Sequence, residues 1–112
     1  SNKSSLQNSL SELVSDSLLE ELNCAVVFID ENYELLNAIG DFKKYIQLPE
    51  KRLNLNILKM VSEDITIPLS TAIRKAFRQN EKSLLRNLRV QDDQKNVKFI
   101  NVVVKPLGEE YK

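Results

Sequence analysis

The stretch Ala25–Gly40 constrains the fold of this chain more than any other part of the sequence. It contains two short apolar runs separated by an acidic turn, and the first of them is Ala25–Ile29. Short runs that are rich in β-branched residues and bounded by turn residues are typical of strands. We therefore expect Cys24–Asp30 to form a buried strand and Tyr33–Ile39 to be its hairpin partner.

The residues before this hairpin follow a different period. Leucine and valine recur every four residues between Ser5 and Leu22, which predicts a leading amphipathic helix. The stripe is too short for a sustained coiled coil, and Ser17 interrupts a strict heptad. Two interpretations stay open, because the helix can pack on its own domain or pair with a second copy. The residues expected to form such a dimer helix are Leu6, Leu10, Leu13, Val14 and Leu18.

After the hairpin the pattern predicts several helices and then two more strands. The expected helices are Asp41–Ile46, Leu53–Val61 and about Ile67–Gln79, the last with Pro68 in its first turn. The expected strands are Ser83–Val90, which alternates in part through Leu84, Leu88 and Val90, and Val97–Val104, joined by the turn Asp92–Asn96. Because Val97–Val104 is almost continuously apolar, we expect it to be covered on both faces. This order predicts an α+β fold with an antiparallel sheet and helices grouped on one face.

The bulk composition limits the possible classes of protein. A chain of 112 residues has room for one domain with a modest core, and 42% apolar with 29% charged residues is ordinary for a soluble chain. Sixteen basic and sixteen acidic residues balance, which argues against a nucleic-acid or membrane partner. The charge is uneven, however, with eight acids and one base up to Asp41. The single cysteine, Cys24, fits a reducing, cytoplasmic location, and we expect it to be a small buried residue.

The chain start resembles the scar of a cleaved tag. We expect residues 1–4 to be a tag remnant with a disordered start, 5–22 to be the leading helix, and 23–112 to be the main domain of a fragment from a longer protein.

The residue types also narrow the chemistry. The chain has no histidine, which removes the common nucleophilic triads and the usual imidazole metal ligand. Two glycines cannot build a glycine-rich phosphate cradle. The carboxylate pairs Glu20-Glu21, Glu63-Asp64 and Asp92-Asp93 lie at expected element ends or in turns, where exposed acids are common. We therefore expect no catalysis, no cofactor and no metal.

Two further groups of residues have alternative interpretations. The basic stretch Arg74, Lys75, Arg78, Lys82, Arg86 and Arg89 is either a solvated face or a docking patch for an acidic partner. A set of large apolar residues forms either an ordinary core or the lining of a small-molecule pocket. This possible pocket lining comprises Phe28, Leu36, Phe42, Tyr45, Ile57, Met60, Ile73, Phe77 and Phe99.

Five blocks of sequence in order, FIDENYELL, GDFKKYIQLPE, LNILKMV, LSTAIRKAF and VVVKPL, carry a family resemblance. Over about Leu18–Leu107 the chain resembles a PAS domain, and most of all the PAS module of bacterial chemotaxis methylesterase–methyltransferase fusion proteins. The motif G-D-x-x-x-Y-x-x-L-P of that module is matched by Gly40, Asp41, Tyr45, Leu48 and Pro49.

The resemblance implies a non-catalytic sensory or interaction module of a cytoplasmic bacterial signal-transduction protein. Such a module would mediate self-association or contacts with other domains of its parent, where the methylation chemistry would lie. The alternative function is a ligand sensor that holds a small apolar molecule in its core. We expect a homodimer formed through the leading helix or an open sheet edge.

The chain departs from the PAS pattern in one respect. A complete PAS domain has five strands, and the sequence predicts four, ending before Glu109–Lys112. Ala25–Ile29 and Val97–Val104 would then border an empty position in the sheet, and unpaired buried backbone groups cost about 1–3 kcal/mol each. The first and fourth strands could pair directly, a second chain could supply a segment, or the sheet could divide. We expect a partner chain or an altered pairing rather than a normal PAS monomer.

Overall fold

The computed structural model describes residues 2–50 and 55–108, with side chains of the leading helix described from Ser9 onward. Two predictions fall on residues outside the described part. They are the start of the second short helix at Leu53 and the lack of a fifth strand at Glu109–Lys112. The chain divides into two compact units, residues 1–57 and 58–112. This division differs from the predicted one, in which residues 23–112 form one domain.

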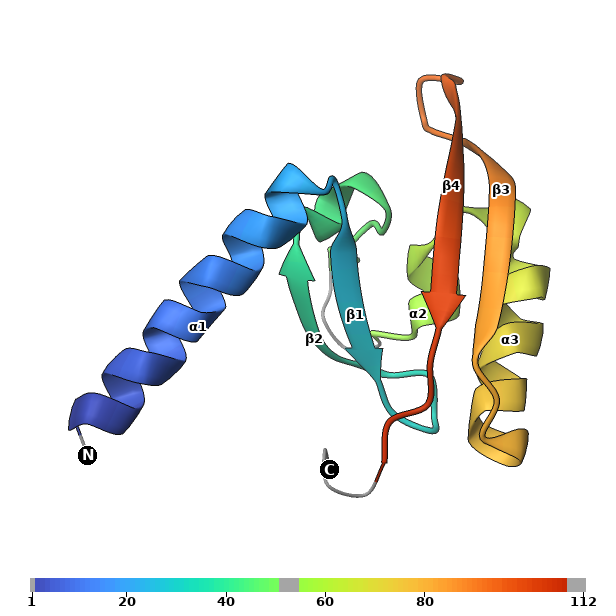
Figure 1. Cartoon of the computed structure of the whole chain (residues 1–112). Coiled ribbons are helices and arrows are strands. Elements are labelled where there is room, and N and C mark those ends of the chain that lie inside the picture. Colours follow the sequence, from blue (N-terminus) through green and yellow to red (C-terminus); the bar gives the residue numbers. More distant parts are fainter. Residues whose placement is uncertain (1, 51–54, 109–112) are drawn as a thin grey trace. The chain divides into compact units, whose positions relative to one another are not determined.

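The first unit consists of a long helix followed by a hairpin (Figure 1). Helix α1 spans Asn2–Glu21, so the helix begins three residues before its expected start. Strands β1 (Ala25–Ile29) and β2 (Leu35–Gly40) pair antiparallel, and the short 3-10 helix η1 follows at Phe42–Lys44.

A short segment near residue 56 extends this hairpin. Leu35 donates its backbone N–H to the Leu55 oxygen at 2.9 Å, and Ile57 donates to the Tyr33 oxygen at 2.8 Å. The segment thus runs antiparallel to the start of β2 and places Ile57 among the buried residues.

The second unit packs a helix on a hairpin. Its elements are helix α2 (Ile57–Met60), which begins at the division between the units, η2 (Glu63–Ile65), α3 (Thr66–Gln79), β3 (Ser83–Gln91) and β4 (Val97–Val104). Helix α3 lies against the β3–β4 hairpin (Figure 1). The buried apolar side chains of this unit are Met60, Ile65, Leu69, Ala72, Ile73, Ala76 and Val90.

The described strands form two separate two-stranded antiparallel sheets rather than one. The α+β class is therefore confirmed, whereas the single sheet of a PAS-type arrangement is not. Of the three outcomes expected for a missing strand, the described pairing corresponds to a divided sheet.

A bulge in β3 decides which side chains face the helix. The register passes from Leu85–Val102 to Leu88–Ile100, so Arg86 and Asn87 together oppose one residue of β4. Asn87 has a φ of 53°, which asparagine tolerates better than most residues. Without this extra residue, strict alternation would turn Leu88 and Val90 away from α3.

Because of the bulge, the expected alternation through Leu84, Leu88 and Val90 was wrong. Leu84 lies on the opposite face from the other two and is exposed, whereas Val90 is buried. The expectation that Val97–Val104 is covered on both faces was also wrong. One face carries the half-buried Ile100, Val102 and Val104, and the other is exposed, because a two-stranded sheet with one covering helix has only one buried face.

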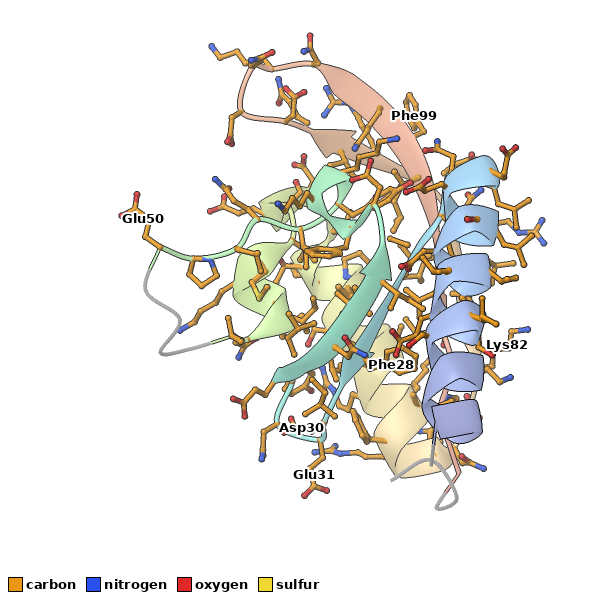
Figure 2. All side chains as sticks on the ribbon, turned by 90° about the vertical axis from the view of Figure 1, so that its left-hand side faces the viewer. Phe28, Asp30, Glu31, Glu50, Lys82 and Phe99 are labelled. Carbon is orange, nitrogen blue, oxygen red and sulfur yellow. The ribbon has the colours of Figure 1, made fainter. Side chains whose placement is uncertain are left out.

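Both hairpins turn in the same way, around an aspartate. Asp30 Oδ1 accepts from the N–H groups of Asn32 (2.8 Å) and Glu34 (3.0 Å). Asp92 Oδ1 accepts from Gln94 (2.9 Å) and Asn96 (2.8 Å) in the second hairpin. Figure 2 shows Asp30 and Glu31 at the tip of the first hairpin.

Each turn also forces a non-glycine residue into the left-handed region, at Tyr33 (φ 65°) and Lys95 (φ 64°). Replacing Lys95 with glycine should raise the free energy of unfolding by about 0.5–1 kcal/mol, because glycine adopts this conformation without the steric cost. Thermal denaturation followed by circular dichroism measures the change. Gln94→Gly is the control, because Gln94 lies outside the positive-φ set, and it should be neutral or destabilising. An equal gain from both variants would contradict this explanation.

Candidate protein-interaction surfaces

Helix α1 exposes most of its apolar residues. We define the α1 stripe as Leu10, Leu13, Val14 and Leu18, which are 52%, 63%, 58% and 56% exposed. They are four of the five residues predicted for a dimer helix, and the side chain of the fifth, Leu6, lies outside the described part. A shallow groove of about 260 Å³ on this side is lined by Leu13, Val14, Ser17, Leu18 and Glu21.

The hairpin of the first unit contacts a different side of α1. Leu19 is half-buried and lies next to Gly40, where an added Cβ would come within 3.2 Å of the Leu19 Cβ. Leu10 and Leu19 are about 2.5 turns apart along the helix and so point to opposite sides. The hairpin therefore cannot cover the α1 stripe, and the N-terminal turns of α1 extend away from it (Figure 1).

A second apolar surface lies on the β3–β4 hairpin. We define the outer face as the exposed residues of β3 and β4 on the side away from α3. The register pairs Leu84 with Val103 and Arg89 with Phe99 on this face. Phe99 is 64% exposed, and its ring projects from β4 (Figure 2). The remaining members are Arg86, Gln91, Val97 and Asn101.

The bases of the predicted stretch lie on two different elements, α3 and β3, and on different sides of the second unit. Arg74, Lys75 and Arg78 are exposed on α3, whereas Arg86 and Arg89 are exposed on the outer face of the hairpin. The residues therefore do not form one patch, because α3 covers the inner face of the sheet. Lys82 lies in the loop that joins α3 to β3.

The nine residues predicted to line a pocket are divided between the units. Phe28, Leu36, Phe42, Tyr45 and Ile57 belong to the first unit, and Met60, Ile73, Phe77 and Phe99 belong to the second. Ile57, Met60 and Ile73 are buried, whereas Leu36, Phe77 and Phe99 are exposed. A ligand pocket lined by these residues stays a prediction.

Cys24 is exposed, so its predicted burial was wrong. Asn23 adopts a φ of 54° and turns the chain at the end of α1. Cys24 then donates its N–H to the Leu19 oxygen at 2.8 Å, which places it at the helix end rather than inside the strand.

A small polar hollow of about 90 Å³ lies next to Cys24, and residues in and beside η1 form part of its lining. The Lys44 Nζ donates to Asn23 Oδ1 at 2.9 Å, and the Tyr45 hydroxyl donates to the Asn23 backbone oxygen at 2.9 Å. Lys44 also forms an ion pair with Asp41 at 3.5 Å. These contacts fix the turn between α1 and β1, so we interpret the hollow as structural.

Within the described residues, no three His, Cys, Asp or Glu side chains are grouped closely enough to hold a metal ion. In the same part of the chain, no helix combines the length and the apolar character needed to cross a membrane.

Comparison of this chain with protein-family models, with curated proteins and with solved structures finds no match. The resemblance to PAS domains, and to the chemotaxis fusions in particular, therefore stays a prediction that rests on the sequence blocks alone.

Proposed function

We propose that this chain is a non-catalytic interaction module that self-associates through the α1 stripe. One observation carries the proposal: four large apolar side chains lie on the side of α1 opposite its contact with the hairpin. Burying an exposed leucine or valine contributes roughly 1.5–3 kcal/mol, so a contiguous row favours association.

The wider assignment, a PAS-type module in a bacterial signalling protein, is part of the same proposal and is supported by the order of the sequence blocks. A module of that kind acts by pairing and by contacts with neighbouring domains, which agrees with an exposed apolar helix. The ligand-sensing alternative stays a prediction, because no observation in the described residues favours it over association.

Replacing Leu10 and Val14 together with glutamate should weaken self-association at least tenfold. Each change removes apolar surface and places a carboxylate in the contact, and about 1.4 kcal/mol corresponds to a factor of ten. Sedimentation velocity over a range of concentrations measures the effect.

The matched control is Ser9→Glu with Ser15→Glu. It adds the same two charges to exposed positions of α1 outside the α1 stripe. Circular dichroism should show unchanged helix content in both variants, since glutamate is a good helix former. A wild-type chain that stays monomeric at all concentrations would refute the proposal.

A further inference from the structure

We propose that the surface receiving the α1 stripe is the outer face of β3 and β4 on a second copy of the chain. This inference rests on the proposed function, because it names the partner surface for the same helix. The occupant of the outer face is therefore α1 of another copy rather than a different protein.

The two surfaces carry complementary charge. The outer face carries two bases, Arg86 and Arg89, and no acid, whereas the third base of these strands, Lys98, pairs with the buried Val90 on the inner face. Among the four acids of α1, Glu21 lines the groove beside the α1 stripe, whereas Glu12 and Asp16 lie seven and three residues before Leu19 and so on its side of the helix. Between Ser9 and Glu21 a second α1 has no base to pair with Glu21, whereas the outer face has Arg86 and Arg89.

The charges also lie where the contact needs them. Glu21 lines the same groove as Leu13, Val14 and Leu18, so its carboxylate belongs to the contact surface. Arg89 is directly opposite Phe99 in the strand register, so its guanidinium belongs to the outer face. An arginine–carboxylate pair at the border of an apolar contact fixes orientation as well as contributing free energy.

The two apolar surfaces match in length. From Leu10 to Leu18 the α1 stripe extends about 12 Å at 1.5 Å per residue. From Phe99 to Val103 the outer face extends about 14 Å at 3.4 Å per residue. One helix can therefore cover two cross-strand pairs of the outer face, Leu84 with Val103 and Arg89 with Phe99.

The two surfaces would permit a reciprocal dimer. Each copy offers one α1 stripe and one outer face, so two copies can exchange helices around a two-fold axis. The α1 stripe and the outer face of each copy are then both covered in the dimer.

The first test is charge reversal in the full chain, measured by sedimentation. Arg86→Glu with Arg89→Glu should weaken self-association at least tenfold, and so should Glu20→Arg with Glu21→Arg. An equimolar mixture of the two variants should recover much of the association, because both α1–outer-face contacts of a mixed dimer then join opposite charges. Arg74→Glu with Arg78→Glu, on α3, is the matched control and should leave association unchanged.

The second test is disulfide trapping in a Cys24→Ser background. Copies carrying only Ser17→Cys are mixed with copies carrying only Val103→Cys, and oxidation should yield heterodimers linked between α1 and the outer face. Because each copy has one cysteine, this bond cannot form within a chain. Homodimers of Ser17→Cys alone would instead indicate α1 pairing with α1 and would overturn the inference.

The outcomes separate the two proposals. If stripe substitutions abolish association while reversal of Arg86 and Arg89 leaves it unchanged, self-association stands and the assignment of the outer face is wrong. If a chain carrying both cysteines cross-links within itself while the mixture does not cross-link, α1 docks on its own chain and the inference is again overturned. Phe99→Ala, which leaves the charges intact, should also weaken association at least tenfold, and thermal denaturation confirms that each variant is folded.

Discussion

Replacing Gly40 with valine is expected to lower the free energy of unfolding by roughly 2–4 kcal/mol. Gly40 has a φ of 78°, a conformation that β-branched residues rarely adopt. A Cβ at this position would also lie 2.7 Å from the Cys24 backbone oxygen and 3.2 Å from the Leu19 Cβ. Neither the strand nor the last turn of α1 can accept the side chain without moving.

Chemical denaturation and amide hydrogen exchange test this expectation. Exchange should accelerate in β1, β2 and the last turn of α1, because Gly40 is where these elements meet. Gly108→Val is the control, since Gly108 is exposed beyond β4 and should tolerate the change within about 0.5 kcal/mol. Equal losses from the two variants would show that the close approach at Gly40 is not the cause.

Replacing Ile73 with alanine is expected to cost about 2–5 kcal/mol of stability. Ile73 is 3% exposed and lies on the buried face of α3 with Leu69, Ala72 and Ala76. Removing its side chain takes apolar atoms from the core and leaves a cavity that the surroundings fill only in part.

Helix α3 offers a matched control for this change. Ile67 belongs to the same helix but is 80% exposed, so Ile67→Ala should change stability by less than about 0.5 kcal/mol. Urea denaturation of both variants measures the difference. Similar midpoints for the two would mean that α3 is not packed as described, and a large loss from Ile67→Ala alone would reverse the assignment of its buried face.

The strands of the second hairpin show how far local pattern determines structure. Val97–Val104 was predicted with the bounds that the structure has, because eight consecutive residues rich in valine favour extended backbone. Its burial was not predicted correctly. A continuous apolar run indicates a strand but does not indicate how many of its faces another element covers.

The bulge at Asn87 could not be predicted from the sequence, because it depends on how two strands pair. Asparagine signals a position that accepts positive φ, yet the same residue occurs in regular turns, so its presence alone does not define a bulge. The pairing of Leu88 with Ile100 and of Leu85 with Val102 determines where the extra residue must sit. That pairing is a property of two strands together.

Of the two candidate interaction surfaces, one was recognisable from the local sequence pattern and the other was not. The α1 stripe was recognised from its period, because helix geometry places residues four apart on one side. The outer face was not recognised, since Leu84, Phe99 and Arg89 are distant in sequence and share a face only through strand register. A signal was present in the bases of Ser83–Val90, but it was interpreted together with the bases of α3 as one stretch.

Helices α1 and α3, the four strands, the positions of the two hairpin turns and the α+β class were predicted from the sequence, because these depend on local period, turn residues and propensity. The structure was needed to show that the strands divide into two sheets, that Cys24 is exposed and that one face of β3–β4 is uncovered. These features depend on which surfaces find a partner. A partner is a non-local choice, made by packing and register among residues far apart in the chain.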